Sequence, residues 1–214
     1  MKYLQLVDLT QNKITKLPQI AIPKLKKLVL DENEIGSSEL KTNHSIQWLS
    51  LDKNKLVSLE GLQRMYELEY LSIQENEPLV SIKGLSNMPK LKKLVLKGNK
   101  IEKLDGLSDL PALEELYLDG NAIASLEEVE KIRRFRNLKT LNMGGCPISD
   151  EKGDDFKKEV IILLGDYLKQ LRVINGDQLT PEEFADAQTE KENRIREAEG
   201  KPPVEEGAEG EEDA

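Results

Sequence analysis

The sequence has little of what disulfide-bonded, metal-binding and redox proteins require. It contains one cysteine, Cys146, and one histidine, His44, in 214 residues. An intramolecular disulfide is therefore excluded, which is typical of proteins from a reducing compartment. His44 lacks the companion ligands of a zinc site, and the sequence has no glycine-rich phosphate loop or nucleophile elbow. We expect no metal, no cofactor and no enzymatic activity.

Aromatic residues and long apolar segments are also scarce. Aromatics make up 4% of the chain, so the core must be aliphatic. No apolar run approaches the roughly 18 residues that a membrane helix needs. Because Met1 and Lys2 lead directly into the first repeat described below, we expect no secretory signal. We expect a soluble cytoplasmic protein that does not enter a membrane.

The net charge of −9 is concentrated near the C-terminus. From Asp177 onward there are 14 acidic and 4 basic residues, whereas the rest of the chain has 26 acidic and 27 basic residues. This balance argues against a general affinity for nucleic acid phosphates. The acidic end either keeps the terminus solvated or docks onto a basic partner.

One stretch, Leu113 to Ile123, recurs along most of the chain with the pattern L-x-x-L-x-L-x-x-N-x-I. Alternating leucines predict a short strand with one buried face, and the asparagine can pair backbone groups at the following turn. The copies begin at seven residues: Leu4, Leu25, Ile46, Leu68, Leu91, Leu113 and Leu138.

The conserved spacing of one polar residue fixes the repeat length. One asparagine recurs every 21 to 23 residues, at Asn12, Asn33, Asn54, Asn76, Asn99 and Asn121. In the seventh repeat Cys146 stands at the asparagine position, 25 residues after Asn121. This is the signature of short leucine-rich repeats, which cannot bury their leucines singly and must stack. We predict an α/β solenoid over residues 1–148, with a curved parallel β-sheet on its concave face. Cys146 should be buried as a small apolar filler.

Short turns should form the convex side. The segments at residues 59–62, 82–85 and 104–107 each carry a glycine between apolar residues, which predicts one turn of 3₁₀ or α-helix. In the fourth repeat Pro78 displaces Leu79 by one place, so we expect a small bulge there.

After Ile148 the period breaks, and residues 149–176 are predicted to form a C-terminal cap. Ser149 and Asp150 are expected to cap a helix, and residues 171–174 resemble one last strand ending at the Asn175–Gly176 turn. The apolar face of that helix should comprise Phe156, Val160, Ile161, Leu163, Leu164, Tyr167 and Leu168.

Residues 177–200 are predicted to contain a charged helix. Thr180, Pro181 and Glu183 form a capping box at its start, and Gly200 ends it. Its apolar residues Phe184, Ala187 and Ile195 form only a thin stripe. Residues 201–214, rich in glutamate and glycine, are expected to be disordered.

The concave face carries the candidate binding residues. Side chains that alternate with the strand leucines point away from the core. Strands about 4.8 Å apart would place Trp48 beside Tyr70, and these residue types anchor protein interfaces. Simple cross-strand stacking is the alternative role. The predicted protein-binding residues are Lys27, Val29, Trp48, Tyr70, Lys93, Val95 and Tyr117.

The repeats resemble the class typified by the regulatory subunit of protein phosphatase 1, with L-x-G-L after the asparagine. The segments Phe156 to Val160 and Leu168-x-x-Leu171 look like a cap shared by acidic nuclear phosphoproteins, a spliceosomal U2 subunit and axonemal proteins. Several later residues are most similar to the radial-spoke leucine-rich-repeat proteins of motile cilia (leucine-rich repeat-containing protein 23): Pro147, Asp150, Glu151, Gly153, residues 182–187, Arg194 and Arg196.

This resemblance implies a non-catalytic scaffold in the axoneme of a cilium or flagellum, bound to radial-spoke or dynein-associated proteins. The alternatives are the leucine-rich light chain of outer-arm dynein, a regulatory subunit of an enzyme such as a protein phosphatase, and a nuclear acidic phosphoprotein-type module. A longer and purer acidic run than Glu205 to Asp213 is usual in the nuclear class.

Overall fold

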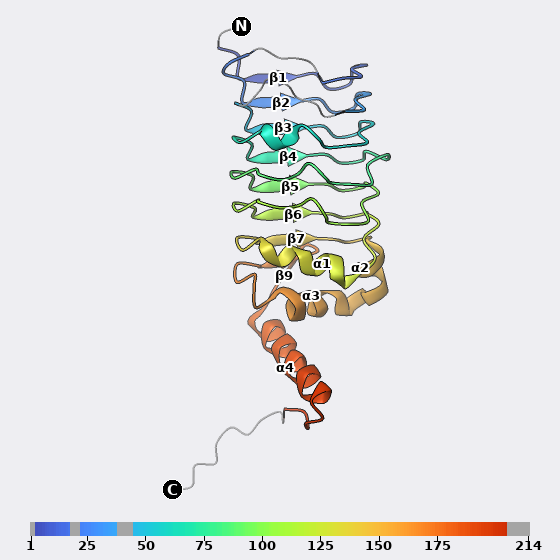
Figure 1. Ribbon diagram of the computed structural model, residues 1–214, viewed down its shortest axis with the longest axis vertical. Coiled ribbons are helices and arrows are strands. Elements are labelled where there is room, and N and C mark those ends of the chain that lie inside the picture. Colours follow the sequence, from blue (N-terminus) through green and yellow to red (C-terminus); the bar gives the residue numbers. More distant parts are fainter. Residues whose placement is uncertain (1–2, 18–21, 38–44, 205–214) are drawn as a thin grey trace.

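The computed structural model describes residues 3–17, 22–37 and 45–204, which form a stack of short strands followed by a helical end (Figure 1). The expectations for His44 and for the acidic residues 205–214 lie outside this range. One sheet contains all nine strands in chain order: β1 (Leu6–Asp8), β2 (Lys27–Val29), β3 (Trp48–Ser50), β4 (Tyr70–Ser72), β5 (Lys93–Val95), β6 (Glu115–Tyr117), β7 (Thr140–Asn142), β8 (Val173–Ile174) and β9 (Asp177–Gln178).

The strand register explains the stack. Strands β1 to β8 are parallel, and from β2 to β7 the central leucine of each strand pairs with that of the next. A strand of three residues buries too little to be stable alone, so each leucine is shielded by the repeats on either side. The fully buried leucines in this row are Leu28, Leu49, Leu71, Leu94, Leu116 and Leu141. The predicted parallel-sheet solenoid is confirmed.

The convex side is less helical than the sequence predicts. Of the three predicted segments, only residues 59–62 lead into a 3₁₀ helix, η1 (Leu62–Arg64). Residues 82–85 and 104–107 are turns, each closed by one backbone hydrogen bond. Glycine is required at these bends. Gly84 has φ +103°, and a Cβ there would lie 2.7 Å from the Leu59 carbonyl oxygen of the preceding repeat.

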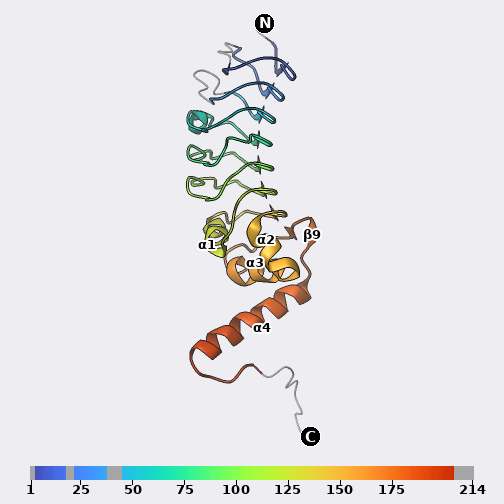
Figure 2. The ribbon, with the colours of Figure 1, turned by 90° about the vertical axis from the view of Figure 1, so that its right-hand side faces the viewer.

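The sixth repeat, whose 25 residues make it the longest, supplies the helices of the convex side. Helix α1 (Leu126–Glu130) continues into the 3₁₀ helix η2 (Lys131–Arg134), and both lie behind the sheet (Figure 2). Val129 and Ile132 are buried beneath them. The extra residues of this repeat therefore form a helical turn in place of the tight bend.

The asparagines form a ladder through the interior of the stack. The Asn54 side-chain amide donates to the carbonyl of Leu51 in its own repeat at 3.1 Å and to that of Leu30 in the preceding repeat at 2.9 Å. Its side-chain oxygen accepts from the Ile35 amide at 3.0 Å. The buried asparagines, from Asn33 to Asn121, thereby pair backbone groups that water cannot reach and tie neighbouring repeats together, whereas Asn12 is exposed and bonds only within its own repeat.

Proline and cysteine modify this ladder at two places. In the other repeats, the side-chain oxygen of each asparagine accepts from the backbone amide two residues after the preceding asparagine. Pro78 occupies that position and has no N–H, so the Asn99 side-chain oxygen accepts from the backbone amide of Asn76 instead, at 2.8 Å. Cys146 is fully buried, as predicted, and its Sγ donates to the Leu118 carbonyl at 3.2 Å. The cysteine is therefore a weaker substitute for the asparagine as well as a filler.

The C-terminal cap begins earlier than predicted. Helix α2 (Pro147–Lys152) starts after Cys146, so the expectation that Ser149 and Asp150 cap a helix is wrong. Proline suits the first turn of a helix, and Ser149 lies inside α2, where its hydroxyl donates to the Cys146 carbonyl. A 3₁₀ turn, η3 (Gly153–Asp155), then leads into α3 (Phe156–Leu164).

Helix α3 and strand β8 close the end of the stack. Phe156, Val160, Ile161 and Leu164 are buried against the last repeat, whereas Tyr167 lies beyond the helix and is exposed. Strand β8 pairs with β7 in parallel, and Asn175 and Gly176 turn the chain into β9, which is antiparallel to β8. β9 thus belongs to the sheet although it lies in the range assigned to the charged helix.

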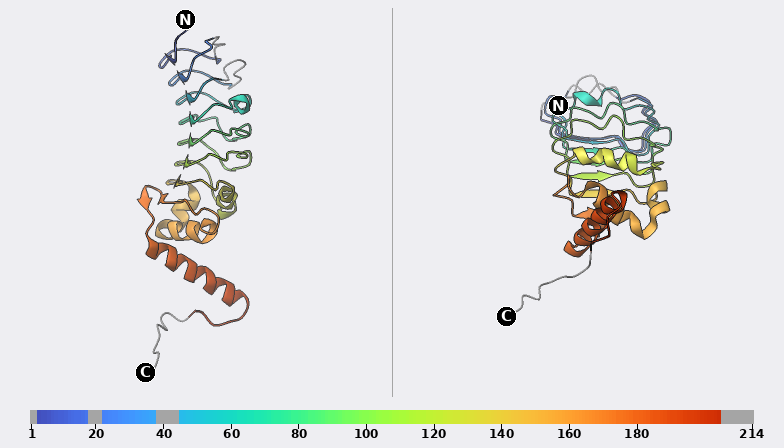
Figure 3. Two further views of the ribbon diagram at one scale, coloured as in Figure 1. Left: turned by 90° about the vertical axis from the view of Figure 1, so that its left-hand side faces the viewer. Right: turned by 60° about the horizontal axis from the view of Figure 1, so that its bottom comes forward.

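Helix α4 (Pro181–Ala198) crosses the end of the stack beneath α3 (Figure 3). The predicted capping box is present, with the Glu183 amide donating to Thr180 Oγ1 at 3.2 Å and the Thr180 amide donating to Glu183 Oε2 at 2.8 Å. Ala187 is buried, Phe184 is partly buried, and Ile195 is exposed. No helix among the described residues is long and apolar enough to cross a membrane.

Ion pairs supply much of the contact between α4 and the cap. Arg194 makes two hydrogen bonds to the Glu159 carboxylate, at 2.8 and 3.0 Å, and Lys191 pairs with Asp166. The hydrogen bond from Arg194 holds the pKa of Glu159 below its ordinary value. With Ala187 as its one buried residue, α4 depends on these charges for its position.

The asparagine ladder predicts a large difference between two chemically identical substitutions. Asn99→Ala removes hydrogen bonds to the Ile73 and Leu96 carbonyls and to the Asn76 amide, all buried. We expect a loss of about 3 kcal/mol of unfolding free energy, because each orphaned buried group costs roughly 1–3 kcal/mol. Asn12→Ala, at an exposed position, should cost under about 1 kcal/mol. Urea unfolding of both variants checks this, and equal losses would contradict it.

The contact of α4 predicts a pH dependence. Since the pKa of Glu159 is lowered in the folded state, its charge stabilises the fold above its unfolded pKa, and the effect is lost as pH falls through the lower folded value. The difference in unfolding free energy between the wild type and Glu159→Gln should therefore be present at about pH 6 and shrink below about pH 4.5.

The matched control is Glu192→Gln, at an exposed position of α4 that forms no ion pair with any residue of the described chain. Its unfolding free energy should follow the wild type at both pH values. A Glu159→Gln difference that is independent of pH would show that the ion pair does not stabilise α4.

Candidate functional site

The open face of the sheet, formed by the outward side chains of β2 to β7, brings the predicted aromatic pair together. Trp48 and Tyr70 occupy paired positions on β3 and β4. Their rings are stacked, with centroids 3.5 Å apart and planes 10° apart. The Trp48 side chain remains 38% exposed. The prediction that the two residues are neighbours on an exposed surface is confirmed.

A lysine extends this stack on each side. Lys27 pairs with Trp48 in the register, and its ammonium lies 4.5 Å from the indole centroid. Lys93 pairs with Tyr70 on the other side. Val29, on the same strand as Lys27, is half-buried. The result is a row of four paired strand positions, in which the Lys27 ammonium contacts the stacked rings while the Lys93 ammonium is directed to Glu115 on the next strand.

A second cluster surrounds Tyr117. The Lys93 ammonium lies 2.6 Å from Glu115 Oε2, and the Tyr117 hydroxyl donates to the same oxygen at 2.8 Å. Partial burial disfavours the Glu115 charge, but these two hydrogen bonds outweigh it and hold the pKa of Glu115 below its ordinary value. Lys93 and Lys97 also lie 4.7 and 4.9 Å from the Tyr117 ring. Lys97 and Glu115 were not among the predicted site residues.

Val95 does not belong to the accessible surface as predicted. Only 5% of it is exposed. Lys93 and Lys97 lie two residues before and after it on the same side of the chain, and both reach to the ring of Tyr117, which pairs with Val95 in the register. The lysine stems and the ring therefore cover Val95.

A ladder of carboxylates and serines borders the open face, and the sequence analysis missed it. Asp31 accepts hydrogen bonds from the Ser50 hydroxyl and the Asp52 amide, at 2.6 and 2.8 Å. Asp52 does the same with Ser72 and Gln74, both at 2.7 Å. Burial raises the pKa of Asp31. The recurring signal was an aspartate directly after the last strand leucine, followed one repeat later by a serine.

The chemistry of the open face suits recognition of a surface. Among the residues that the structure describes, no three His, Cys, Asp or Glu side chains are grouped so as to hold a metal. Large amphipathic rings held rigidly beside cations are the residue types that anchor protein interfaces. In both side views α4 lies at the end of the stack and leaves this face uncovered by the described chain (Figures 2 and 3).

Comparisons with known families and structures agree with this architecture. The family described as "Leucine rich repeat" matches residues 67–123, and a second family of the same description matches residues 136–151. No curated protein sequence matches the chain.

Two solved structures are similar. A chain of the Drosophila melanogaster SNF/U2A′ complex is 20% identical, with a TM-score of 0.55, and the match covers 67% of this chain and 83% of that one. Internalin C2 from Listeria monocytogenes is 26% identical, with a TM-score of 0.47 and coverage of 64% and 70%. The first likeness shows the fold.

The stacked aromatic pair leads to a stability prediction. Trp48→Ala should lower the unfolding free energy by only about 1 kcal/mol, because the ring is partly exposed and loses mainly its stacking. Leu116→Ala, in the fully buried strand row, should cost about 2–5 kcal/mol. Thermal and urea unfolding measure both. A loss at Trp48 as large as that at Leu116 would identify the indole as a core residue.

Proposed function

Because the chain carries leucine-rich repeats, we propose that it is a non-catalytic scaffold that binds another polypeptide on its open sheet face. The observation that carries the proposal is the stacked Trp48–Tyr70 pair, held between Lys27 and Lys93 on an uncovered sheet. A flat aromatic platform gains most when a partner removes it from water, as at the centre of protein interfaces.

The partner should offer apolar side chains to the rings and a carboxylate to Lys27. Lys27 contacts the indole, and no carboxylate of the described residues lies within ion-pair distance of it. Lys93, in contrast, is already paired with Glu115 at 2.6 Å. Of these two lysines, the one without an ion pair in the described chain therefore lies on the β2 side of the rings, and this asymmetry would set the orientation of a bound segment.

As the setting of this scaffold, we propose the axoneme of a cilium or flagellum, with a radial-spoke or dynein-associated protein as partner. The support is the resemblance of the cap and charged helix to radial-spoke leucine-rich-repeat proteins, above all at Pro147, Asp150, Glu151, Gly153 and residues 182–187. The ion pairs between α4 and the cap give this end a charged surface suited to contacts in a large assembly.

A scaffold of a nuclear RNA–protein complex is the second candidate. The similar chain of known structure comes from the SNF/U2A′ complex, and the match covers most of that chain. At 20% identity the likeness supports a common architecture. In either setting, the open face would bind the partner.

Retention in detergent-extracted axonemes tests the proposal. The tagged wild-type protein should resist extraction, and Trp48→Ala combined with Tyr70→Ala should release it. With the purified partner, the double variant should bind more weakly by over about 2 kcal/mol, or roughly thirtyfold, as expected for two interface anchors.

The matched control is Val57→Ala combined with Val80→Ala, two exposed apolar residues outside the sheet. This variant should be retained like the wild type. Release of both variants, or retention of both, would overturn the role of the open face. Nuclear accumulation of the wild type would favour the second candidate.

A further inference from the structure

A second surface lies along the lateral edge of the stack, where the chain approaches the strands of the last repeats. Two exposed rows occur there, four and two residues before the first leucine of each repeat. In the order of the stack, the first row is Asn87, Asp109, Arg134 and Tyr167, and the second is Pro89, Pro111, Arg136 and Lys169. The residue between each pair is buried, so the rows flank a groove with an apolar floor: Met88, Leu110, Phe135 and Leu168.

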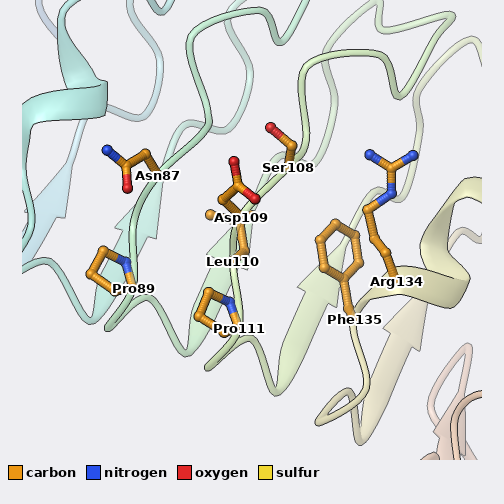
Figure 4. A pocket seen from close by; sticks show the side chains of 8 residues that line it. All are labelled: Asn87, Pro89, Ser108, Asp109, Leu110, Pro111, Arg134 and Phe135. Atoms are coloured by element: carbon orange, nitrogen blue, oxygen red, sulfur yellow. The ribbon is translucent and has the colours of Figure 1, made fainter.

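The groove opens into a hollow of about 430 Å³ that spans the ends of the fourth, fifth and sixth repeats. Figure 4 shows Pro89 and Pro111 along one flank, with Phe135 and Arg134 at the end toward the cap. Two proline rings, a leucine and a phenylalanine form half of its lining, and the other half is polar: Asn87, Ser108, Asp109 and Arg134. This volume and lining suit one large apolar side chain.

The basic residues beside the hollow differ from others on the same edge. Lys90, Lys92 and Lys139 each pair with a glutamate of the preceding repeat, at 2.6 to 2.8 Å. The charges of these three lysines are therefore largely neutralised by their glutamate partners.

Arg134 and Arg136 bond to backbone carbonyls instead. Arg134 donates to the Leu107 and Lys131 carbonyls, both at 2.9 Å, and Arg136 donates to the Tyr167 carbonyl at 3.2 Å. Arg136 also lies 5.1 Å from the Tyr167 ring. Among the described residues no carboxylate is within ion-pair distance of Arg134, Arg136 or Lys169. Both guanidinium groups are thus held in place while their charge remains free for a carboxylate.

We propose that this lateral edge is a second docking surface, which binds an acidic polypeptide segment carrying one large apolar side chain. The apolar side chain would fill the hollow, and carboxylates on its cap side would meet Arg134, Arg136 and Lys169. A polypeptide fits better than a nucleic acid, because an apolar side chain can pack against the Pro89, Pro111 and Phe135 rings of the hollow, where a phosphate backbone would gain nothing.

The test uses the full chain and a fluorescein-labelled peptide of alternating glutamate and glycine with one central phenylalanine. Fluorescence polarisation should show saturable binding. Replacing the peptide's phenylalanine by alanine, or its glutamates by glutamine, should weaken binding at least about tenfold. Amide NMR shifts should move at Ser108 to Leu110 and not on β3 and β4.

Matched protein variants separate this edge from general electrostatics. Arg136→Gln with Lys169→Gln should weaken binding about tenfold, since two charge-assisted contacts are lost. Lys13→Gln with Lys100→Gln, an equal charge change at exposed sites after the asparagines, should leave binding unchanged. Trp48→Ala should also leave it unchanged, so failure here is distinct from failure of the open face.

Four results would overturn the proposal. Two of them are the absence of saturable binding and an equal weakening of binding by both double variants. The third is tighter binding of a single-stranded RNA oligomer at the same edge. The fourth is binding of the peptide only after the acidic residues among 205–213 are changed to glutamine. The last result would identify the chain's own acidic end as the occupant.

Discussion

Hydrogen bonding of buried backbone groups is the constraint on which this structure depends. Each turn that leaves a strand carries amides and carbonyls into the interior of the stack, where water cannot pair them. The asparagine side chain donates to two repeats and accepts from one, so it satisfies these groups and joins successive turns at the same time. Where Pro78 removes an amide, the acceptor takes the nearby Asn76 amide, and the strand register is preserved.

Because the interior is occupied by leucines and asparagines, recognition is left to the outward positions. Because the strands are parallel and equivalent residues of successive repeats are paired, the side chains at each outward position form a row that runs across the repeats. On the open face this places Lys27, Trp48, Tyr70 and Lys93 side by side. On the lateral edge it aligns the prolines with Arg136 and Lys169. The two surfaces therefore arise from the same repeat geometry, and they differ in chemistry: aromatic platform on one, apolar hollow with free guanidinium groups on the other.

The C-terminal end of the solenoid is covered by two layers that are held by different means. At the C-terminal end, α3 and β8 cover the last repeat with apolar side chains, and α4 is then held on the outside largely by Arg194, Lys191 and Lys157. Apolar burial makes the cap part of the core, whereas exposed ion pairs are individually weak. Helix α4 is therefore the element of the described chain most sensitive to pH and to charge substitution.

The sequence by itself determined the solenoid, the asparagine ladder, the burial of Cys146, the capping box at Thr180 and the proximity of Trp48 to Tyr70, because each follows from a period or a local motif. Only the tertiary structure decided that Val95 is covered, that α2 begins at Pro147, that β9 joins the sheet, and that Arg134 and Arg136 lack carboxylate partners. These outcomes depend on how long side chains lean across neighbouring repeats and on how the chain turns after the last one. Period and motif fix where a residue lies along the stack, but not which side chains of the adjacent turns cover it.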